Sequence, residues 1–171
     1  MCRAPRSDAR RSARRLVMAD AVIERLDPRD LATVTHLYNT IFRPERDEAW
    51  IRNRMRGRHN ILVMVARIEK DAVGFYVGFE LKPGTHFTWL VGVVSDLRRS
   101  GIASQLMHGA EEWCRTEGYG RLRFECDNRI RPFLIFGIAN AYDIVGIRWD
   151  QDRMSNLIIF EKGLGGPADT R

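Results

Sequence analysis

The chain has 171 residues, 44% of them hydrophobic, so its length suits one domain with a sizeable core. Its longest apolar runs, 61–66 and 133–139, are far shorter than a membrane span, and we expect a soluble, cytoplasmic protein with no membrane partner. Three cysteines and four histidines show neither disulfide-framework nor metal-ligand spacing, which predicts reduced thiols and no metal site.

The net charge of +6 is concentrated at one end of the chain. Residues 1–17 contain six arginines and one aspartate, so the rest is almost neutral and we expect no nucleic-acid partner for the folded body. We predict a disordered Arg-rich extension over 1–19, a single domain over 20–164 and a loose tail over 165–171. The extension has three interpretations: an upstream start before a natural beginning at Met18, which the general excess of arginine over lysine favours, a transit peptide, or a nucleic-acid-binding arm.

The first half of the chain predicts a strand, two helices and three further strands. The strand covers 21–26, and Asp27-Pro28 then predicts a helix cap with proline in the first turn. Apolar residues at helical spacing predict helices from there to about Phe42 and from Glu45 to about Arg58. Apolar runs separated by short turn-forming segments predict an antiparallel meander of strands over 61–68, 72–81 and 87–94.

The most informative segment joins the last of these strands to a helix that begins near Ser100. It reads Arg98-Arg99-Ser100-Gly101-Ile102-Ala103. The first N–H groups of a helix have no intrahelical partners and point outward from the positive end of its dipole, so an anion such as pyrophosphate can bind them. Gly101 and Ala103 allow a phosphate to approach the backbone, and Arg98 and Arg99 add charged donors.

Four further elements follow this helix, which we expect Gly118 to end. They are a strand over 121–126, a helix over 132–141, and strands over 142–149 and 157–161. The sequence therefore predicts one α/β domain with a mixed, mostly antiparallel sheet of seven strands and four helices.

The segment from Val93 to Ser104 resembles the acyl-CoA signature of the GCN5-related N-acetyltransferase (GNAT) family. In that signature Gln/Arg-x-x-Gly-x-Gly/Ala follows a strand reading Val-x-Pro, and here Ser95 stands in the place of the proline. The order of elements resembles the family from about Ala21 to Leu164. The resemblance implies a GNAT-like sheet whose fourth and fifth strands splay apart and admit the pantetheine arm of acetyl-CoA.

The resemblance implies that acetyl-CoA is the co-substrate and suggests which residues bind it. Main-chain groups of the strand before the motif would pair with pantetheine and polarise the thioester carbonyl, and they belong to Val91, Gly92, Val93 and Val94. The pyrophosphate would lie at the motif itself, on Arg98, Arg99, Ser100, Gly101, Ile102, Ala103 and Ser104. Asn128 occupies a position from which the family often bonds the cofactor arm.

Acetyl transfer to an amine also needs a group that accepts the proton of the amine. We predict Glu80, near the end of a strand, as this general base. Glu125, on a later strand, is the alternative, and either carboxylate can act directly or through water. His86 and Ser95 are weaker candidates in the same region.

The departing thiolate needs a proton donor. The family commonly places a tyrosine for this purpose where Ile135 and Phe136 stand here, and neither can give a proton. Tyr142 is the remaining candidate, although it aligns better with a structural aromatic residue of the family. Cys126 is followed by no histidine that forms a recognisable dyad, so we expect a core residue and direct transfer.

The expected acceptor is a primary amine of a small molecule or a peptide. In the resembled fold the first two helices form one wall of the acceptor groove, so Tyr38, Phe42 and Trp50 can contact substrate, although packing is their simpler role. Acidic residues near the groove would attract a cationic amine, and they are Glu80, Glu125, Asp127 and Asp143. Homodimers are common in the family, so a homodimer is also expected.

Three functions follow from these patterns. The leading one is a CoA-dependent N-acetyltransferase. The alternative is an acyl-CoA-binding or regulatory module that keeps the cleft without turnover, because the usual tyrosine is absent. The third is nucleic-acid binding through the arm over 1–17, which predicts a steeply salt-dependent affinity.

Overall fold

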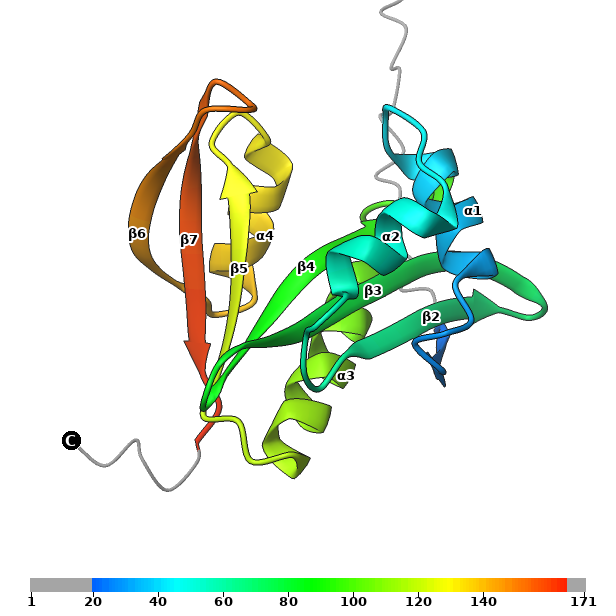
Figure 1. The fold of residues 1–171 in the computed structure, drawn as a ribbon, viewed down its shortest axis with the longest axis horizontal. Helices are drawn as coiled ribbons and strands as arrows, with labels where there is room; N and C mark the ends of the chain where they lie inside the picture. Colours follow the sequence, from blue (N-terminus) through cyan, green and yellow to red (C-terminus); the bar gives the residue numbers. More distant parts are fainter. Residues whose placement is uncertain (1–19, 166–171) are drawn as a thin grey trace, which may run out of the picture.

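The computed structural model describes residues 20–165, so the expectations for 1–19 and 166–171 fall outside the described residues. Its elements are β1 (Val22–Leu26), α1 (Ala32–Ile41), α2 (Glu48–Met55), β2 (Leu62–Ile68), β3 (Asp71–Lys82), β4 (Thr85–Val93), a 3-10 turn (Ser95–Leu97), α3 (Ile102–Thr116), β5 (Arg121–Asp127), α4 (Arg131–Ala139), β6 (Asp143–Asp150) and β7 (Ser155–Gly163) (Figure 1).

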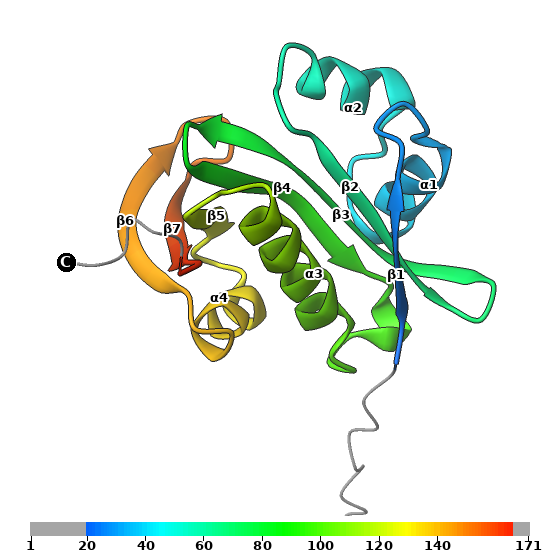
Figure 2. The ribbon, with the colours of Figure 1, turned by 90° about the horizontal axis from the view of Figure 1, so that it is seen from below.

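The seven strands form one sheet in the order β1-β2-β3-β4-β5-β7-β6. Neighbouring strands are antiparallel except β4 and β5, which are parallel. Helices α3 and α4 cover one face of the sheet, and α1 and α2 cover the other face over β2, β3 and β4 (Figure 2). The mixed, mostly antiparallel sheet predicted from the sequence is therefore confirmed.

The parallel pair β4 and β5 is hydrogen-bonded over only part of its length. Residues Thr85–Thr88 pair with Arg121–Phe124, yet β4 continues to Val93 and β5 to Asp127. The two strands therefore separate towards their C-terminal ends, and Figure 1 shows the sheet dividing there into two halves. This is the splay that the family resemblance implies.

A hydrophobic core fills each side of the sheet. One cluster includes Leu106 of α3 and Phe124 of β5, and the other includes Leu37 of α1 and Phe75 of β3. Helices α1 and α3 thus each bury one apolar stripe, as their residue spacing predicts. In contrast, β6 lies at the edge of the sheet and is largely exposed along its length.

The start of α1 differs from the prediction. The helix begins at Ala32, and Asp27 does not cap it. The Asp27 carboxylate accepts hydrogen bonds from the backbone N–H and side chain of Arg29, and the N–H of Asp30 bonds to the Asp27 carbonyl. Aspartate often bonds the backbone two residues ahead, and here that local turn replaces the expected helical cap.

Two other helix ends, the start of α2 and the end of α3, follow ordinary capping rules. Asp47 caps α2 by accepting a bond from the N–H of Trp50, so α2 begins at Glu48 and not at Glu45. Gly118, the second residue after α3, has φ +82°, which confirms the predicted glycine stop. Within the described part of the chain, none of the helices combines the length and apolar character needed to cross a membrane.

Candidate functional site

The start of α3 has the backbone geometry of an anion-binding site. Gly101 occupies the N-cap position with φ +88°, a left-handed conformation that glycine adopts without steric cost. No side chain caps the helix there, so the outward N–H groups of Ile102, Ala103 and Ser104 remain available to a ligand. A negatively charged group at this position would also be stabilised by the helix dipole.

The side chains before the helix shape this turn. The Arg98 Nε donates to the carbonyl oxygen of Val93 at 3.3 Å, which ties the motif to the end of β4. The Ser100 hydroxyl donates to the Leu97 carbonyl at 2.6 Å, so this hydroxyl stabilises the turn. Arg99, with φ +65°, is exposed, and its guanidinium can approach an anion from solvent.

A β-bulge marks the point where β4 leaves β5. Val77 of β3 lies opposite Leu90 and Gly78 lies opposite Thr88, so Trp89 has no partner on β3. Thr88 is also the last residue of β4 that pairs with β5. From Trp89 onward the outer edge of β4 faces the gap between the two strands, and bulges of this kind often lie beside active sites.

The cofactor residues expected from the resemblance converge on this gap. Because β4 and β5 are parallel, their C-terminal ends meet at one edge of the sheet. The half-buried Val91 and the buried Val93 line the β4 side, the motif follows β4, and Asn128 directly follows β5. An unpaired strand edge beside an uncapped helix start suits an extended arm that ends in a pyrophosphate, so these residues fit acetyl-CoA.

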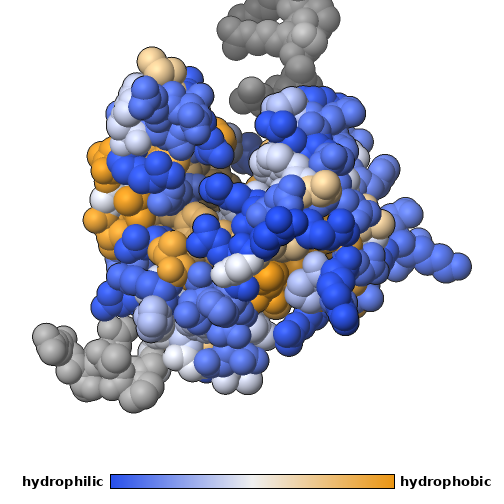
Figure 3. Space-filling model, in the orientation of Figure 1, coloured by the Kyte–Doolittle hydropathy of each residue, from blue (hydrophilic) through white to orange (hydrophobic). Residues whose placement is uncertain are grey.

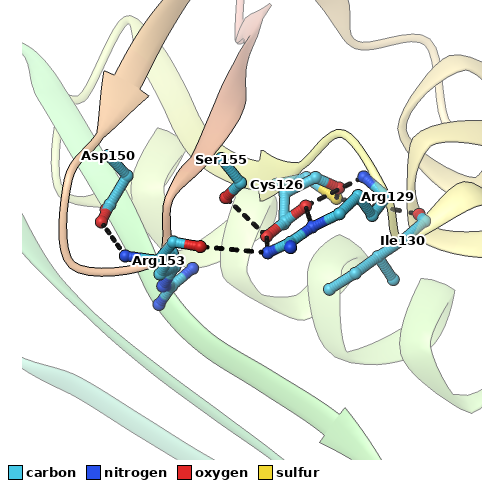
Figure 4. A network of polar contacts seen from close by, with 7 residues as sticks. Cys126, Arg129, Ile130, Asp150, Arg153 and Ser155 are labelled. Atoms are coloured by element: carbon cyan, nitrogen blue, oxygen red, sulfur yellow. Dashed lines mark hydrogen bonds and ion pairs between the residues drawn. The ribbon is translucent and has the colours of Figure 1, made fainter.

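A polar network fixes the turn that carries Asn128 (Figure 4). Asp127 at the end of β5 is buried and accepts bonds from the backbone and guanidinium of Arg129 and from the Ser155 hydroxyl at 2.7 Å. The Arg129 hydrogen bonds lower the pKa of Asp127 well below its usual range. Arg129 also donates to the carbonyl oxygen of Arg153 in the β6–β7 turn, so this network connects the two turns.

The predicted base Glu80 lies at the opposite end of β4. It pairs with His86, in the region where β4 and β5 remain hydrogen-bonded. The Tyr119 hydroxyl donates to its carboxylate at 2.6 Å and lowers the pKa of Glu80, and Asn60 donates at 3.1 Å. The structure therefore does not bring Glu80 to the gap with the cofactor residues.

His86, a weaker candidate, belongs to the same network. It is fully buried, and its Nε2 lies 3.0 Å from the carbonyl oxygen of Asn60. Burial lowers the pKa of His86 to about 4, so the ring is neutral at physiological pH. Ser95, by contrast, is exposed in the turn after β4, and its hydroxyl donates to Asp96.

Glu125 is the carboxylate that the register places at the gap. It directly follows Phe124, the last residue of β5 that pairs with β4. Phe124 packs on the core beneath α3, so Glu125 points to the opposite face of the sheet, as Trp89 does. Its carboxylate accepts two bonds from the Arg148 guanidinium, at 2.7 and 2.9 Å, which hold it in position.

The remaining acid candidate, Tyr142, is part of the core. Only 3% of it is exposed, and its hydroxyl donates to the buried carboxylate of Glu111 at 2.8 Å. Burial raises the pKa of Tyr142 far above its usual value. Cys126 is also buried, and burial raises its pKa to about 11, so its thiol stays protonated at neutral pH.

Aromatic side chains pack around Trp89 on the face of the sheet that α1 and α2 cover. Trp89 contacts Trp50 of α2, with ring centroids 5.4 Å apart, and Trp50 contacts Tyr38 of α1 at 5.6 Å. Figure 3 shows the surface hollowed between this half of the molecule and the half built by β5, β7 and β6. Among the described residues no group of histidine, cysteine and acidic side chains is arranged to hold a metal ion.

The position of Trp89 at a β-bulge is not apparent from the sequence. It lies in a continuous apolar run, 87–94, where residue spacing gives no sign of a bulge. Only the register with β3 shows that Trp89 is the extra residue, and that Trp89 and Leu90 therefore face the same side. No local signal distinguishes it from other strand tryptophans.

Comparisons with known proteins agree with this geometry. Residues 31–133, more than half of the chain, match the family model described as Acetyltransferase (GNAT) family. The fold is similar to the ribosomal-protein-S18-alanine N-acetyltransferase of Escherichia coli, with a TM-score of 0.74 and 14% identity over 89% of this chain and 99% of that one.

Two other solved structures show the same similarity. Ard1 of Thermoplasma volcanium has a TM-score of 0.71 and 21% identity, covering 85% of this chain and 98% of its own. A GNAT family acetyltransferase of Elizabethkingia anophelis, solved with acetyl-CoA bound, has a TM-score of 0.67 and 15% identity, covering 84% and 97%. No curated protein sequence matches the chain. The family model and the shared fold lead to one conclusion: the chain belongs to the acetyltransferase (GNAT) family.

Proposed function

We propose that this protein transfers the acetyl group of acetyl-CoA to a primary amine, directly within a ternary complex. The observation that carries the proposal is the meeting of two features at one edge of the sheet. The uncapped start of α3 can bind a pyrophosphate, and the unpaired edge of β4 beyond Trp89 can bind an extended arm. Membership of the acetyltransferase family supports the same chemistry.

The chain's own groups would position the reactants. The first N–H groups of α3, with Arg98 and Arg99, would hold the pyrophosphate, and main-chain groups from Val91 to Val94 would orient the arm and polarise its carbonyl. When bound, acetyl-CoA supplies the activated acyl group: the amine nitrogen forms a bond to the carbonyl carbon while the carbon–sulfur bond breaks. Asn128, at the end of β5, would contact the arm from the other side of the gap.

Glu125 is the base that we propose in place of Glu80. It lies one residue beyond the last β4–β5 pair and faces the same side as Trp89, whereas Glu80 lies at the paired end. Because Arg148 holds its carboxylate, Glu125 would take the amine proton through a water molecule. The buried Tyr142 is bonded to Glu111, so the thiolate would instead receive its proton from solvent in the groove.

The test is a calorimetric titration of acetyl-CoA, followed by a screen of primary amines in which released CoA thiol is measured. We expect micromolar binding and acceptor-dependent CoA release. An absence of binding by well-folded protein would contradict the cofactor assignment.

The alternative is an acyl-CoA-binding or regulatory module of the same fold. One observation favours it: at the usual position of the proton donor, the structure has Ile135 with 67% of its surface exposed. Acetyl-CoA that binds tightly but is not consumed with any amine in the screen would support this alternative over the enzyme.

We further propose a homodimer in the cytoplasm. The edge strand β6 supports the dimer, because its Ile144, Ile147 and Trp149 are each more than half exposed and an edge strand offers unpaired backbone groups to a second copy. Light scattering on Ile147→Lys and on wild-type protein tests this assembly. A monomeric wild-type protein would contradict it.

A further inference from the structure

Two turns of this chain contain the same local arrangement of an aspartate and an arginine, but the fold surrounds them differently. The Asp27 carboxylate accepts bonds from the backbone N–H, Nε and Nη2 of Arg29 at 2.9, 3.0 and 2.7 Å. The Asp127 carboxylate accepts the same three bonds from Arg129, at 2.9, 2.9 and 2.7 Å. The side chain of Asp27 is 49% exposed, whereas that of Asp127 is 7% exposed. The difference between the two turns therefore lies in their tertiary contacts.

The buried Asp127 carboxylate has a further partner on another strand. Ser155, the first residue of β7, is buried and donates its hydroxyl to Oδ2 of Asp127 at 2.7 Å (Figure 4). Arg129 also donates to the carbonyl oxygen of Arg153 in the β6–β7 turn, at 3.3 Å. Within the described part of the chain, the carboxylate of Asp27 bonds only to its neighbouring arginine. The turn after β5 is thus fixed by β7 as well as by its own residues.

Asn128 lies between the two bonded residues of this turn. Its backbone N–H donates to the carbonyl oxygen of Asn156 at 3.0 Å, and the N–H of Ile130 donates to the carbonyl oxygen of Asp127 at 2.9 Å. Asn128 is exposed, and among the described residues no hydrogen bond involves its side-chain amide. The fold therefore fixes the backbone of Asn128 and leaves its amide available to a ligand.

We propose that Asp127 and Ser155 are positioning residues, which hold the turn after β5 so that the Asn128 amide meets the arm of acetyl-CoA at the gap. This inference rests on the proposed acetyltransfer. Ordering a loop when a ligand binds costs affinity, so a turn that is fixed beforehand binds the ligand more tightly. Hydrogen bonds to a carboxylate are also stronger than those between neutral groups. Asp127 is therefore engaged within the fold, and is not the exposed charge that the sequence suggested would attract an amine.

The experiment compares two ligands that differ in the arm. Acetyl-CoA contains the pantetheine arm, and adenosine 3′-phosphate 5′-diphosphate is the fragment of CoA that keeps the pyrophosphate and lacks that arm. Asp127→Asn keeps the size of the side chain and removes its charge. It should weaken acetyl-CoA binding about tenfold, and leave the affinity for the fragment within about threefold of wild type. Calorimetry measures both affinities, and thermal unfolding checks that each variant is folded.

A second variant and a matched control accompany Asp127→Asn. Ser155→Ala removes one hydroxyl on β7 whose bond is to Asp127, and should weaken acetyl-CoA binding about three- to tenfold. Asp27→Asn makes the same chemical change in the exposed turn, and should keep both affinities at the wild-type value. Wild-type affinity for acetyl-CoA in both Asp127→Asn and Ser155→Ala would overturn the proposal. An equal loss of affinity for the two ligands would overturn it as well.

A double-mutant cycle tests whether Asp127 acts through Asn128. The backbone of Asn128 does not have a positive φ, so Asn128→Ala introduces no strain. In the Asn128→Ala background, Asp127→Asn should change acetyl-CoA affinity by less than about twofold, because the amide that it positions is already absent. A loss of about tenfold in this background would refute the positioning role.

These measurements need no turnover, so they separate this proposal from the enzymatic one. The expected affinities in protein that acetylates no amine would support the positioning role together with the acyl-CoA-binding module. Turnover by protein whose acetyl-CoA affinity is unchanged in Asp127→Asn and Ser155→Ala would support the enzyme and refute the positioning role. Folded wild-type protein that does not bind acetyl-CoA would overturn both.

Discussion

The two ends of β4 differ in whether their polar groups are hydrogen-bonded within the fold. At Thr85–Thr88 the strand is paired on both sides, and the buried His86 and Thr88 are hydrogen-bonded to Asn60 and Tyr76. From Trp89 to Val93 one edge faces the gap, close to a helix start with no side-chain cap. Polar groups satisfied within the fold contribute stability, whereas groups left available at the gap can bind a ligand.

The largest effect on acetyl-CoA binding should come from a change at the start of α3, beside the unpaired end of β4 (Trp89–Val93). Gly101→Glu places a carboxylate and a strained left-handed residue where the pyrophosphate is expected, and should weaken acetyl-CoA binding at least about 100-fold. Gly118→Glu is the matched control, because it adds the same charge at φ +82° after the other end of α3, where a Cβ meets nothing within 4 Å. Calorimetry on both variants, with thermal unfolding as a check of folding, measures the difference. Equal affinities in the two variants would remove the pyrophosphate from this helix start.

At the paired end of β4 (Thr85–Thr88), His86 should make the free energy of unfolding depend on pH. Burial lowers its folded-state pKa to about 4 from an ordinary 6.5, so below pH 6.5 the unfolded chain binds a proton that the folded protein does not. The free energy of unfolding should therefore fall by about 3 kcal/mol as pH drops from 6.5 to 4, and change little from this group above pH 6.5.

Urea unfolding at several pH values measures this effect by comparison with His86→Phe. That variant keeps an aromatic ring beside Trp113 and Tyr119 but removes the titrating group, so its pH dependence should be weaker. His36→Phe, at an exposed position, should behave like wild-type protein. Identical slopes for wild-type protein and His86→Phe would mean that His86 is not the titrating group.

The smallest of these effects distinguishes the two carboxylates. Glu125→Gln should lower kcat about 10- to 100-fold, because a general base at the gap loses its charge. Glu80→Gln, at the paired end of β4, should leave kcat within about threefold of wild type and should act mainly on stability through the lost bond from Tyr119. Steady-state kinetics with one acceptor provides both values. A large loss in Glu80→Gln with a normal Glu125→Gln would restore the assignment that the sequence favours.

The sequence alone determined the order of the elements and the glycine-containing turn at the start of α3. Both depend on local chemistry: apolar spacing along each segment, the outward N–H groups at a helix start, and a glycine at a left-handed position. Two local expectations differed from the structure: α2 begins at Glu48 and not at Glu45, because Asp47 caps it, and the cap expected at Asp27-Pro28 is absent, because the Asp27 carboxylate bonds Arg29 and forms a turn.

Only the tertiary structure decided which side chains reach the gap. Glu80 and Glu125 both lie on strands and look equivalent in the sequence, but the β3–β4 and β4–β5 registers place Glu80 beside His86 near the start of β4 and Glu125 at the level of Trp89, where the gap opens. The packing of Trp89 against Trp50 and Phe79 depends on a bulge and on contacts between segments far apart in the chain. Strand register and long-range packing are set by the whole fold, so no local pattern encodes them.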